Sequence, residues 1–291
     1  MSKSITPPQH QTPGESEPKY QYEHGHSSIT VNGIVRILEH LYARTPAKFR
    51  SAVVAGLVSP AFFLALLGVG LGSLVDERQG QGANAALGAD SYLEFIGPGL
   101  LAISAILWSF GQSLWPTAAT VQWDKTYILS AVTPVSKAEI AIAHVTWIVL
   151  RFVVAAALFT GVLTVAGAAS SWWAVLAPLA AGLTVAAISS CVCAFTIRQD
   201  DENMFPMLMR MGAIPMFLFS GAFFPLREMP AAVAWLSRLL PCWHGVELCR
   251  DLASGSLDGT FTTIHVFYLL GVTAIGMTAV VSGFEKRLSD A

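Results

Sequence analysis

The segment 241–251 carries the side chains of this sequence that are best suited to chemistry. It reads PCWHGVELCRD, so His244, Glu247 and Arg250 recur at intervals of three, with Asp251 beside them. Residues three apart share a helix face, where an imidazole and a carboxylate could ligate a metal or transfer a proton. No second such pair accompanies them, so we interpret His244 as a hydrogen-bonding residue. An active site for lipid chemistry at the outer membrane surface is the alternative.

Familiar catalytic and nucleotide motifs are missing from the sequence. There is no GxxxxGK[ST] phosphate loop, so this chain is not expected to bind ATP in that manner. HExxH and GxSxG are missing as well. The four cysteines form no CxxC pair and are expected to be free thiols. We therefore expect no metal, no cofactor and no catalytic residues in this chain.

Composition indicates a membrane protein. The 291 residues are 54% hydrophobic and only 12% charged, with a mean hydropathy of +0.56. A soluble domain carries about 25% charged residues, and half that share could not cover a surface that faces water. The excess apolar surface must face lipid or other membrane helices. The net charge of −2 gives no reason to expect a nucleic acid partner.

Six apolar stretches approach or exceed the ~20 residues that a helix needs to cross a bilayer. They lie near 53–75, 95–115, 140–166, 172–196, 205–226 and 263–284. The predicted fold class is therefore an all-α integral membrane protein with six transmembrane helices in a domain at 46–285. Residues 1–28 are polar and proline-containing, which predicts a disordered tail. Residues 286–291 form a short C-terminal end.

Lysine and arginine placement predicts the orientation, because cytoplasmic loops carry the excess of these residues. With the N-terminus inside, cytoplasmic segments hold eleven of them: Lys3, Lys19, Arg36, Arg44, Lys48, Arg50, Lys125, Lys137, Arg198, Lys286 and Arg287. Outside segments hold four: Arg78, Arg227, Arg238 and Arg250. Both termini are therefore expected in the cytoplasm.

Two regions outside the spans have helical patterns. Apolar residues recur at helical spacing over 29–45, which predicts an amphipathic helix that lies in the membrane interface or packs on protein. The region 227–262 contains two short apolar patterns separated by Pro241. We expect two re-entrant helices there that dip into the outer leaflet, and no seventh span.

Polar residues inside spans are costly and tend to be functional or paired. Arg151 lies eleven residues into the third predicted span. It either contacts a substrate or gate, or it pairs with a carboxylate or reaches the interface. His144 and His265 lie near span ends, where a polar tip that reaches the interface is expected. No Asp or Glu lies centrally in a span, which argues against an ion-coupled secondary transporter, kept as an alternative.

Three stretches resemble motifs of one family. They are YLEFIGPGLL at 92–101, LSAVTP followed by VSKAEI at 129–140, and SGAFFP at 220–225 with its downstream pattern. The downstream residues are Pro230, Pro241, His244, Glu247 and Arg250, after Pro225 of the motif itself. In order and spacing the sequence resembles the membrane subunit (permease) of ABC-2 type exporters, particularly the nodulation-factor and daunorubicin-resistance exporter branch.

The resemblance implies partners and a task. A bacterial permease of this kind lies in the cytoplasmic membrane, pairs with a second copy or a homologous permease, and is driven by two ABC ATPase subunits that hold ATP and magnesium. It moves an amphipathic or lipid-linked substrate. By position, the ATPase-docking residues are Gln122, Trp123, Asp124, Lys125, Arg198, Asp200, Asp201 and Glu202. A non-transporting scaffold subunit is a further alternative.

Aromatic residues of the spans are candidates for lining the pathway, although each could equally be a lipid-facing or packing surface. They are Phe62, Phe63, Trp108, Phe110, Phe217, Phe219, Phe223 and Phe224.

Overall fold

The computed structural model describes residues 30–44, 46–71, 91–123, 136–223 and 226–289, and every regular element in these ranges is helical. The predicted tail at 1–28 lies outside them. The elements are α1 (Val31–Arg44), α2 (Pro46–Phe63), η1 (Leu64–Leu71), α4 (Tyr92–Ser113), α5 (Trp115–Ala118), η2 (Ala119–Trp123), α7 (Lys137–Val165), η3 (Trp172–Leu176), α8 (Ala177–Thr196), α9 (Met204–Leu208), η4 (Met209–Ala213), α10 (Ile214–Leu218), η5 (Leu226–Glu228), α11 (Ala231–Arg238), α12 (Pro241–Ser254) and α13 (Gly259–Ser289).

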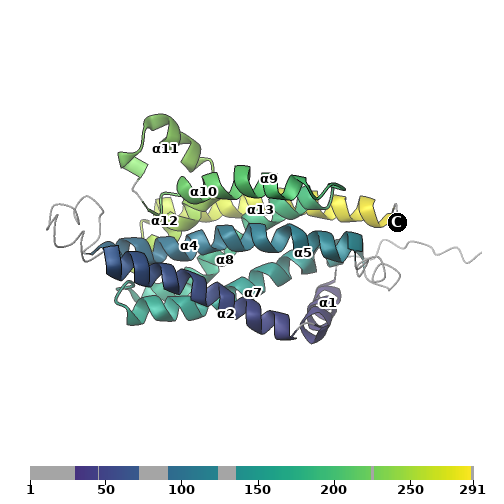
Figure 1. The fold of residues 1–291 in the computed structure, drawn as a ribbon, viewed down its shortest axis with the longest axis horizontal. Coiled ribbons are helices and arrows are strands. Elements are labelled where there is room, and N and C mark those ends of the chain that lie inside the picture. Colours follow the sequence, from purple (N-terminus) through teal and green to yellow (C-terminus); the bar gives the residue numbers. More distant parts are fainter. Residues whose placement is uncertain (1–29, 45, 72–90, 124–135, 224–225, 290–291) are drawn as a thin grey trace, which may run out of the picture.

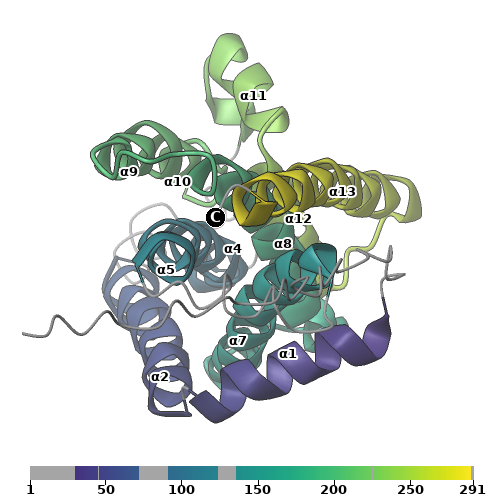
Figure 2. The same ribbon diagram turned by 90° about the vertical axis from the view of Figure 1, so that its right-hand side faces the viewer.

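Four of the six predicted spans correspond to helices that are long and apolar enough to cross a membrane. They are Tyr92–Val121, Lys137–Val165, Trp172–Arg198 and Gly259–Arg287. They run along the long axis of the molecule, and α8 lies at the centre, packed against α4, α7 and α13 (Figures 1 and 2). Small residues allow these close approaches, since a Cβ added at Gly182 of α8 would lie 2.5 Å from Val153 of α7.

The other two predicted spans correspond to shorter apolar helices, Val53–Gly68 and Met204–Leu218. At 1.5 Å per residue the second reaches about 22 Å, less than the ~30 Å of a hydrocarbon core. The prediction of a helix through residue 226 is wrong, because regular structure ends at Leu218 and Gly221 follows with a φ of +79°. Left-handed backbone of this kind ends a helix.

The predicted amphipathic helix forms α1, which crosses the end of the bundle at which α13 also ends (Figures 1 and 2). Its beginning is fixed to the start of α7. The amide and hydroxyl of Thr30 both donate to Glu139 Oε1 at 2.6 Å, and the Ser136 amide donates to Glu139 Oε2 at 2.8 Å. One carboxylate therefore caps α7 and fastens α1 to it. Gly33 makes space for this carboxylate because it has no side chain: a Cβ added there would lie 2.4 Å from Glu139 Oε1.

The segment 116–139, which joins the second and third predicted spans and is expected on the cytoplasmic side, begins as a helix. Pro116 lies in the first turn of α5, where its missing N–H is harmless, and η2 continues to Trp123. Thr117, Ala118 and Val121 are buried in the bundle, so the expected loop starts later than the sequence predicted. The histidine near this end does not reach the interface as expected. His144 is buried, and its Nε2 lies 2.9 Å from the Thr117 hydroxyl.

The contact between α13 and α8 gives a direct test of the packing. A Cβ at Gly276 would lie 2.2 Å from Ser190 Oγ and 3.0 Å from the Cys191 amide, whereas a Cβ at Gly271 of the same helix would meet nothing within 4 Å. Gly276→Leu should therefore force the helices apart, at a typical overpacking cost of about 1–3 kcal/mol. We expect it to lower the apparent melting temperature in detergent, measured by gel filtration after heating. Gly271→Leu should leave that temperature within error, and equal losses in the two variants would contradict this packing.

Candidate functional site

Helix α12 carries four residues of the family-like pattern: Pro241, His244, Glu247 and Arg250. It runs from Pro241 to Ser254 and is capped by Gly255, whose amide donates to the Asp251 carbonyl and whose φ of +79° suits this position. The predicted break at Pro241 is therefore confirmed. Helix α12 packs against α4, α8 and α13, while α11 projects from the end of the molecule opposite α1 (Figure 1). Insertion of the two helices into the outer leaflet stays a prediction.

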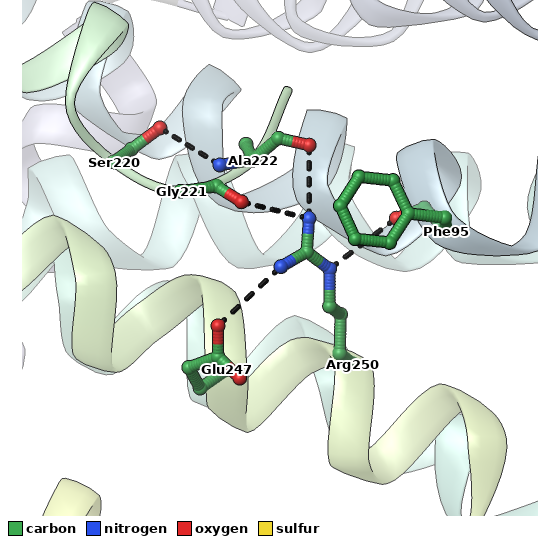
Figure 3. Close-up of polar contacts among 6 residues, drawn as sticks. All are labelled: Phe95, Ser220, Gly221, Ala222, Glu247 and Arg250. Atoms are coloured by element: carbon green, nitrogen blue, oxygen red, sulfur yellow. Dashed lines mark hydrogen bonds and ion pairs between the residues drawn. The ribbon is translucent and has the colours of Figure 1, made fainter. Parts of the chain in front are cut away.

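Arg250 is the most connected residue of this region (Figure 3). Its Nη2 donates to the carbonyls of Gly221 at 3.0 Å and Ala222 at 2.9 Å, and its Nε donates to the Phe95 carbonyl at 3.3 Å. Its Nη1 forms an ion pair with Glu247 at 3.4 Å, and its guanidinium lies 3.9 Å from the centre of the Phe95 ring. The guanidinium therefore connects three separate segments of the chain.

The SGAFFP motif supplies the other half of this contact. Gly221 adopts the left-handed conformation, and the Ser220 hydroxyl accepts a hydrogen bond from the Ala222 amide at 3.3 Å. This turn directs the carbonyl oxygens of Gly221 and Ala222 towards Arg250 (Figure 3). The turn lies directly on α4, because a Cβ added at Gly99 would be 3.1 Å from the Ala222 oxygen. Phe224 and Pro225 of the motif lie outside the described residues.

His244 forms a pair with His265 of α13 instead of a site with Glu247. The two Nδ1 atoms are 2.8 Å apart, and His244 Nε2 lies 3.0 Å from the Arg238 carbonyl. A carbonyl only accepts, so His244 Nε2 carries the proton, its neutral ring accepts at Nδ1, and His265 Nδ1 donates. Each histidine is only 5% exposed, so the expectation that His265 reaches the interface is wrong.

This arrangement bears on the metal and enzyme alternatives. Among the described residues, no group of three or more His, Cys, Asp and Glu side chains could hold a metal ion. His244 and Arg250 are both committed to hydrogen bonds within the protein. Their geometry supports a structural role for these two side chains.

A cavity of about 250 Å³ lies between α2 and α4, and it is bounded further by α7 and the end of α10. Four of the predicted aromatics line it: Phe63, Trp108, Phe217 and Phe223. Phe110 instead lines a second cavity of about 350 Å³ beside α8 and α13. Neither cavity includes Phe62 or Phe219, and Phe62 is 65% exposed. A role of any of these aromatics in lining a transport pathway stays a prediction.

Arg151 lies beside this cavity. Its Nη2 donates to Gln112 Oε1 at 3.0 Å, and Gln112 is itself part of the cavity wall. Its guanidinium carbon lies 5.9 Å from the Trp108 ring centre and 5.5 Å from that of Trp147. Sequence reasoning missed Gln112, although a glutamine within an apolar span was the available signal.

Two of the predicted docking residues contact α13, whereas the others do not contact it in the interactions described or lie outside the described residues. Arg198 donates to the Ala279 carbonyl at 2.7 Å and the Ser282 hydroxyl at 2.9 Å, and Asp200 pairs with Arg287 at 2.5 Å. Both therefore fasten the loop after α8 to α13. Asp201 Oδ1 accepts from the Asn203 amide, and Glu202 is exposed beside it. Gln122 and Trp123 end η2, whereas Asp124 and Lys125 lie outside the described residues.

Comparison with known proteins places these features in a family. The model of the family "ABC-2 type transporter" matches residues 41–253. The chain is also similar to curated relatives called Nodulation protein J. It is 27% identical over 239 residues to that of Sinorhizobium fredii (strain NBRC 101917 / NGR234), covering 82% of this chain and 87% of the relative. It is 26% identical over 209 residues to that of Rhizobium meliloti (strain 1021), covering 71% and 75%.

The Arg250 contacts predict a large effect from a conservative change. Arg250→Lys keeps the charge but cannot reach three carbonyls in different directions. Leaving buried carbonyls unpaired costs about 1–3 kcal/mol, so we expect a lower apparent melting temperature and faster amide hydrogen exchange at 219–223. Arg238→Lys on exposed α11 is the matched control and should change neither. Unaltered exchange in Arg250→Lys would show that the contact does not hold this turn.

The histidine pair predicts an acid-sensitive fold. Burial lowers the pKa of His244 to about 4 from 6.5, so its stabilising contribution is complete above 6.5 and is lost as the pH falls towards 4. Burial raises the pKa of Asp251 to about 6, which acts in the opposite direction over the same range. Comparison with His244→Gln cancels the Asp251 effect. The melting-temperature difference between wild type and His244→Gln should shrink between pH 7 and pH 4.5, and a difference that is independent of pH would contradict the assignment.

Proposed function

Because the chain belongs to the ABC-2 type transporter family, we propose that it is the permease of an ATP-binding cassette exporter driven by a separate ATPase chain. The family match over 41–253 is the observation that carries this proposal. The all-helical described structure, with its four long apolar helices, suits a membrane subunit. The sequence has no phosphate loop of its own, which supports placing ATP and magnesium in the partner.

The proposed topology has six spans in a bacterial cytoplasmic membrane, with both termini inside. Helix α1 and the C-terminal end of α13 lie at the same end of the molecule, as this topology requires (Figure 1). The excess of lysine and arginine in the segments of that end supports its assignment to the cytoplasm. The short helix Met204–Leu218 would then cross together with the irregular turn that Arg250 stabilises.

The proposed partners are two ATPase subunits and a second permease, either another copy or a homologue. Residues 122–125 and 198–203 are the proposed docking segments. The end of η2 and the loop after α8 both lie at the end of the molecule that carries α1 (Figure 1), so one partner could contact all three. Movement of the partner at α1 would reach α7 directly through Thr30 and Glu139.

The proposed substrate is amphipathic or lipid-linked. The cavity between α2 and α4 supports this, because its walls are predominantly apolar and Gln112 adds a polar group. Tilting of α2 and α4 during the ATPase cycle would open the cavity to the opposite side of the membrane.

A paired substitution tests the docking and the ATPase requirement together. Asp124→Ala with Lys125→Ala should reduce co-purification of a Walker-motif ATPase at least about tenfold, a loss of about 1.4 kcal/mol in binding, because both charged contacts are removed. Asp76→Ala with Arg78→Ala, in a predicted outer loop, removes the same kinds of charge and should leave co-purification unchanged. ATP-dependent movement of an amphipathic probe in reconstituted vesicles should follow the same order. Wild-type protein that retains no such ATPase under any mild solubilisation would remove the exporter proposal.

A further inference from the structure

The wall of the cavity between α2 and α4 includes the amide side chain of Gln112. Its Oε1 accepts a hydrogen bond from Arg151 Nη2 at 3.0 Å. Arginine has donors only, so this contact fixes which end of the amide is the carbonyl. The Nε2 end, which carries two N–H groups, has no hydrogen-bond partner among the described residues. Gln112 therefore brings unpaired donors to the cavity wall.

The other polar side chains of the wall do not offer an oriented donor. Trp108 Nε1 and the Ser104 hydroxyl both donate to backbone carbonyls, at 3.2 and 2.6 Å, and Ser59 is exposed. None of the described residues that line the cavity carries a charge. A charged head group would lose its hydration there without a paired charge in the wall, whereas an uncharged oxygen would gain a hydrogen bond from Gln112.

Arg151 acts on this cavity through Gln112, because its own side chain is not part of the wall. Its Nε lies 3.4 Å from the Trp147 carbonyl, and its guanidinium carbon lies 5.9 Å from the Trp108 ring centre and 5.5 Å from that of Trp147. These contacts hold the guanidinium, which in turn holds the amide. A cation that bonds to Oε1 also polarises the amide, which makes the two N–H groups of Nε2 stronger donors.

The remainder of the wall is suited to an apolar chain. Along α4 it extends from Leu100 to Gln112, about 18 Å at 1.5 Å per residue. Small residues provide space, and a Cβ at Gly111 would meet nothing within 4 Å. The large apolar residues of the wall are Phe63, Leu107, Phe152, Phe217 and Phe223. An apolar cavity with one oriented donor suits a ligand that has a long chain and one accepting group.

We propose that Gln112 is a ligand-contacting residue, and that the ligand is an amphipath with an apolar chain and an uncharged head that carries an accepting oxygen. An amide or ester carbonyl is such an oxygen. Gln112 Nε2 donates to it, Arg151 is the positioning residue for Gln112, and the chain lies between α2 and α4. The inference rests on the proposed export function and names the substrate class of the same cavity.

Photolabelling of the purified full chain in lipid nanodiscs tests this hydrogen bond without any ATPase. The photoprobe is N,N-dimethyltetradecanamide with a diazirine in its chain, and labelled peptides are identified by mass spectrometry. The competitors are unlabelled N,N-dimethyltetradecanamide, whose head only accepts hydrogen bonds, and tetradecane, which has no acceptor. The ratio of their half-inhibitory mole fractions in lipid gives the preference for the acceptor. We expect the amide to compete about fivefold more strongly, as one neutral hydrogen bond would give.

Gln112→Glu separates the donor from the contact that positions it. The carboxylate still accepts from Arg151 but has no N–H groups, so the preference for the amide should disappear. Ser59→Ala, which changes another polar residue of the wall, should preserve the preference. A preference that survives in Gln112→Glu would overturn the proposal.

Arg151→Met tests the positioning role. The amide of Gln112 would then rotate freely, so the preference for the acceptor should fall while competition by tetradecane stays the same. Both values are measured on the same folded protein, so a loss of stability alone would not change their ratio. An unchanged ratio would overturn the positioning role of Arg151.

A permanently charged competitor tests the class of head group. Tetradecyl sulfate should compete more weakly than the amide, because its charge would be buried without a partner in the wall. Stronger competition by the sulfate would overturn the assignment of an uncharged head.

Occupancy of the cavity is tested by filling it. Gly111→Leu should weaken labelling of the cavity wall, and because leucine is a better helix former than glycine the variant is expected to fold. Gly161→Leu, on the exposed face of α7 where a Cβ also meets nothing within 4 Å, should leave labelling unchanged. Equal labelling of the two variants would place the probe outside this cavity. If ATP-dependent transport is shown but no preference for the acceptor is found, only the substrate class is wrong.

Discussion

Backbone groups in an apolar environment must find hydrogen-bond partners within the protein, and this requirement shapes the structure around Arg250. The chain leaves helical geometry after Leu218, so the carbonyls of Gly221 and Ala222 have no helical partners. Arg250 supplies donors to both from α12 and also reaches the Phe95 carbonyl at the start of α4. This one side chain therefore links α12 to the turn after α10 and to the start of α4, where Gly99 allows the turn to approach closely.

Charged side chains play a similar part at the opposite end of the bundle. Glu139 joins α1 to α7, and Arg198 joins the end of α8 to α13. Between the two ends, the helices are held by small residues and apolar packing, which have no preferred hydrogen-bond direction. The cavity between α2 and α4 lies in this middle region, beside the hydrogen bond between Arg151 and Gln112.

The histidines and arginines show how far residue type alone leads. His244, Glu247 and Arg250 recur at helical spacing, and the helix that this predicts is present. Several of their partners, however, lie far away in the sequence: His265 is 21 positions from His244, and Phe95 is 155 positions from Arg250. A local pattern contains no information about such contacts, so the choice between a metal ligand and a hydrogen-bonded histidine needed the tertiary structure.

The sequence by itself determined the helical membrane class, the amphipathic α1 and the break at Pro241, because hydropathy, helical periodicity and proline geometry act over short distances. The family match over residues 41–253 likewise comes from the sequence alone. Only the tertiary structure decided that the helix of the fifth predicted span ends at Leu218, that α5 and η2 follow α4 as far as Trp123, and that Arg151 contacts Gln112, which lines a cavity. These features depend on which helices pack together, and the free energy of that packing is shared among residues far apart in the chain.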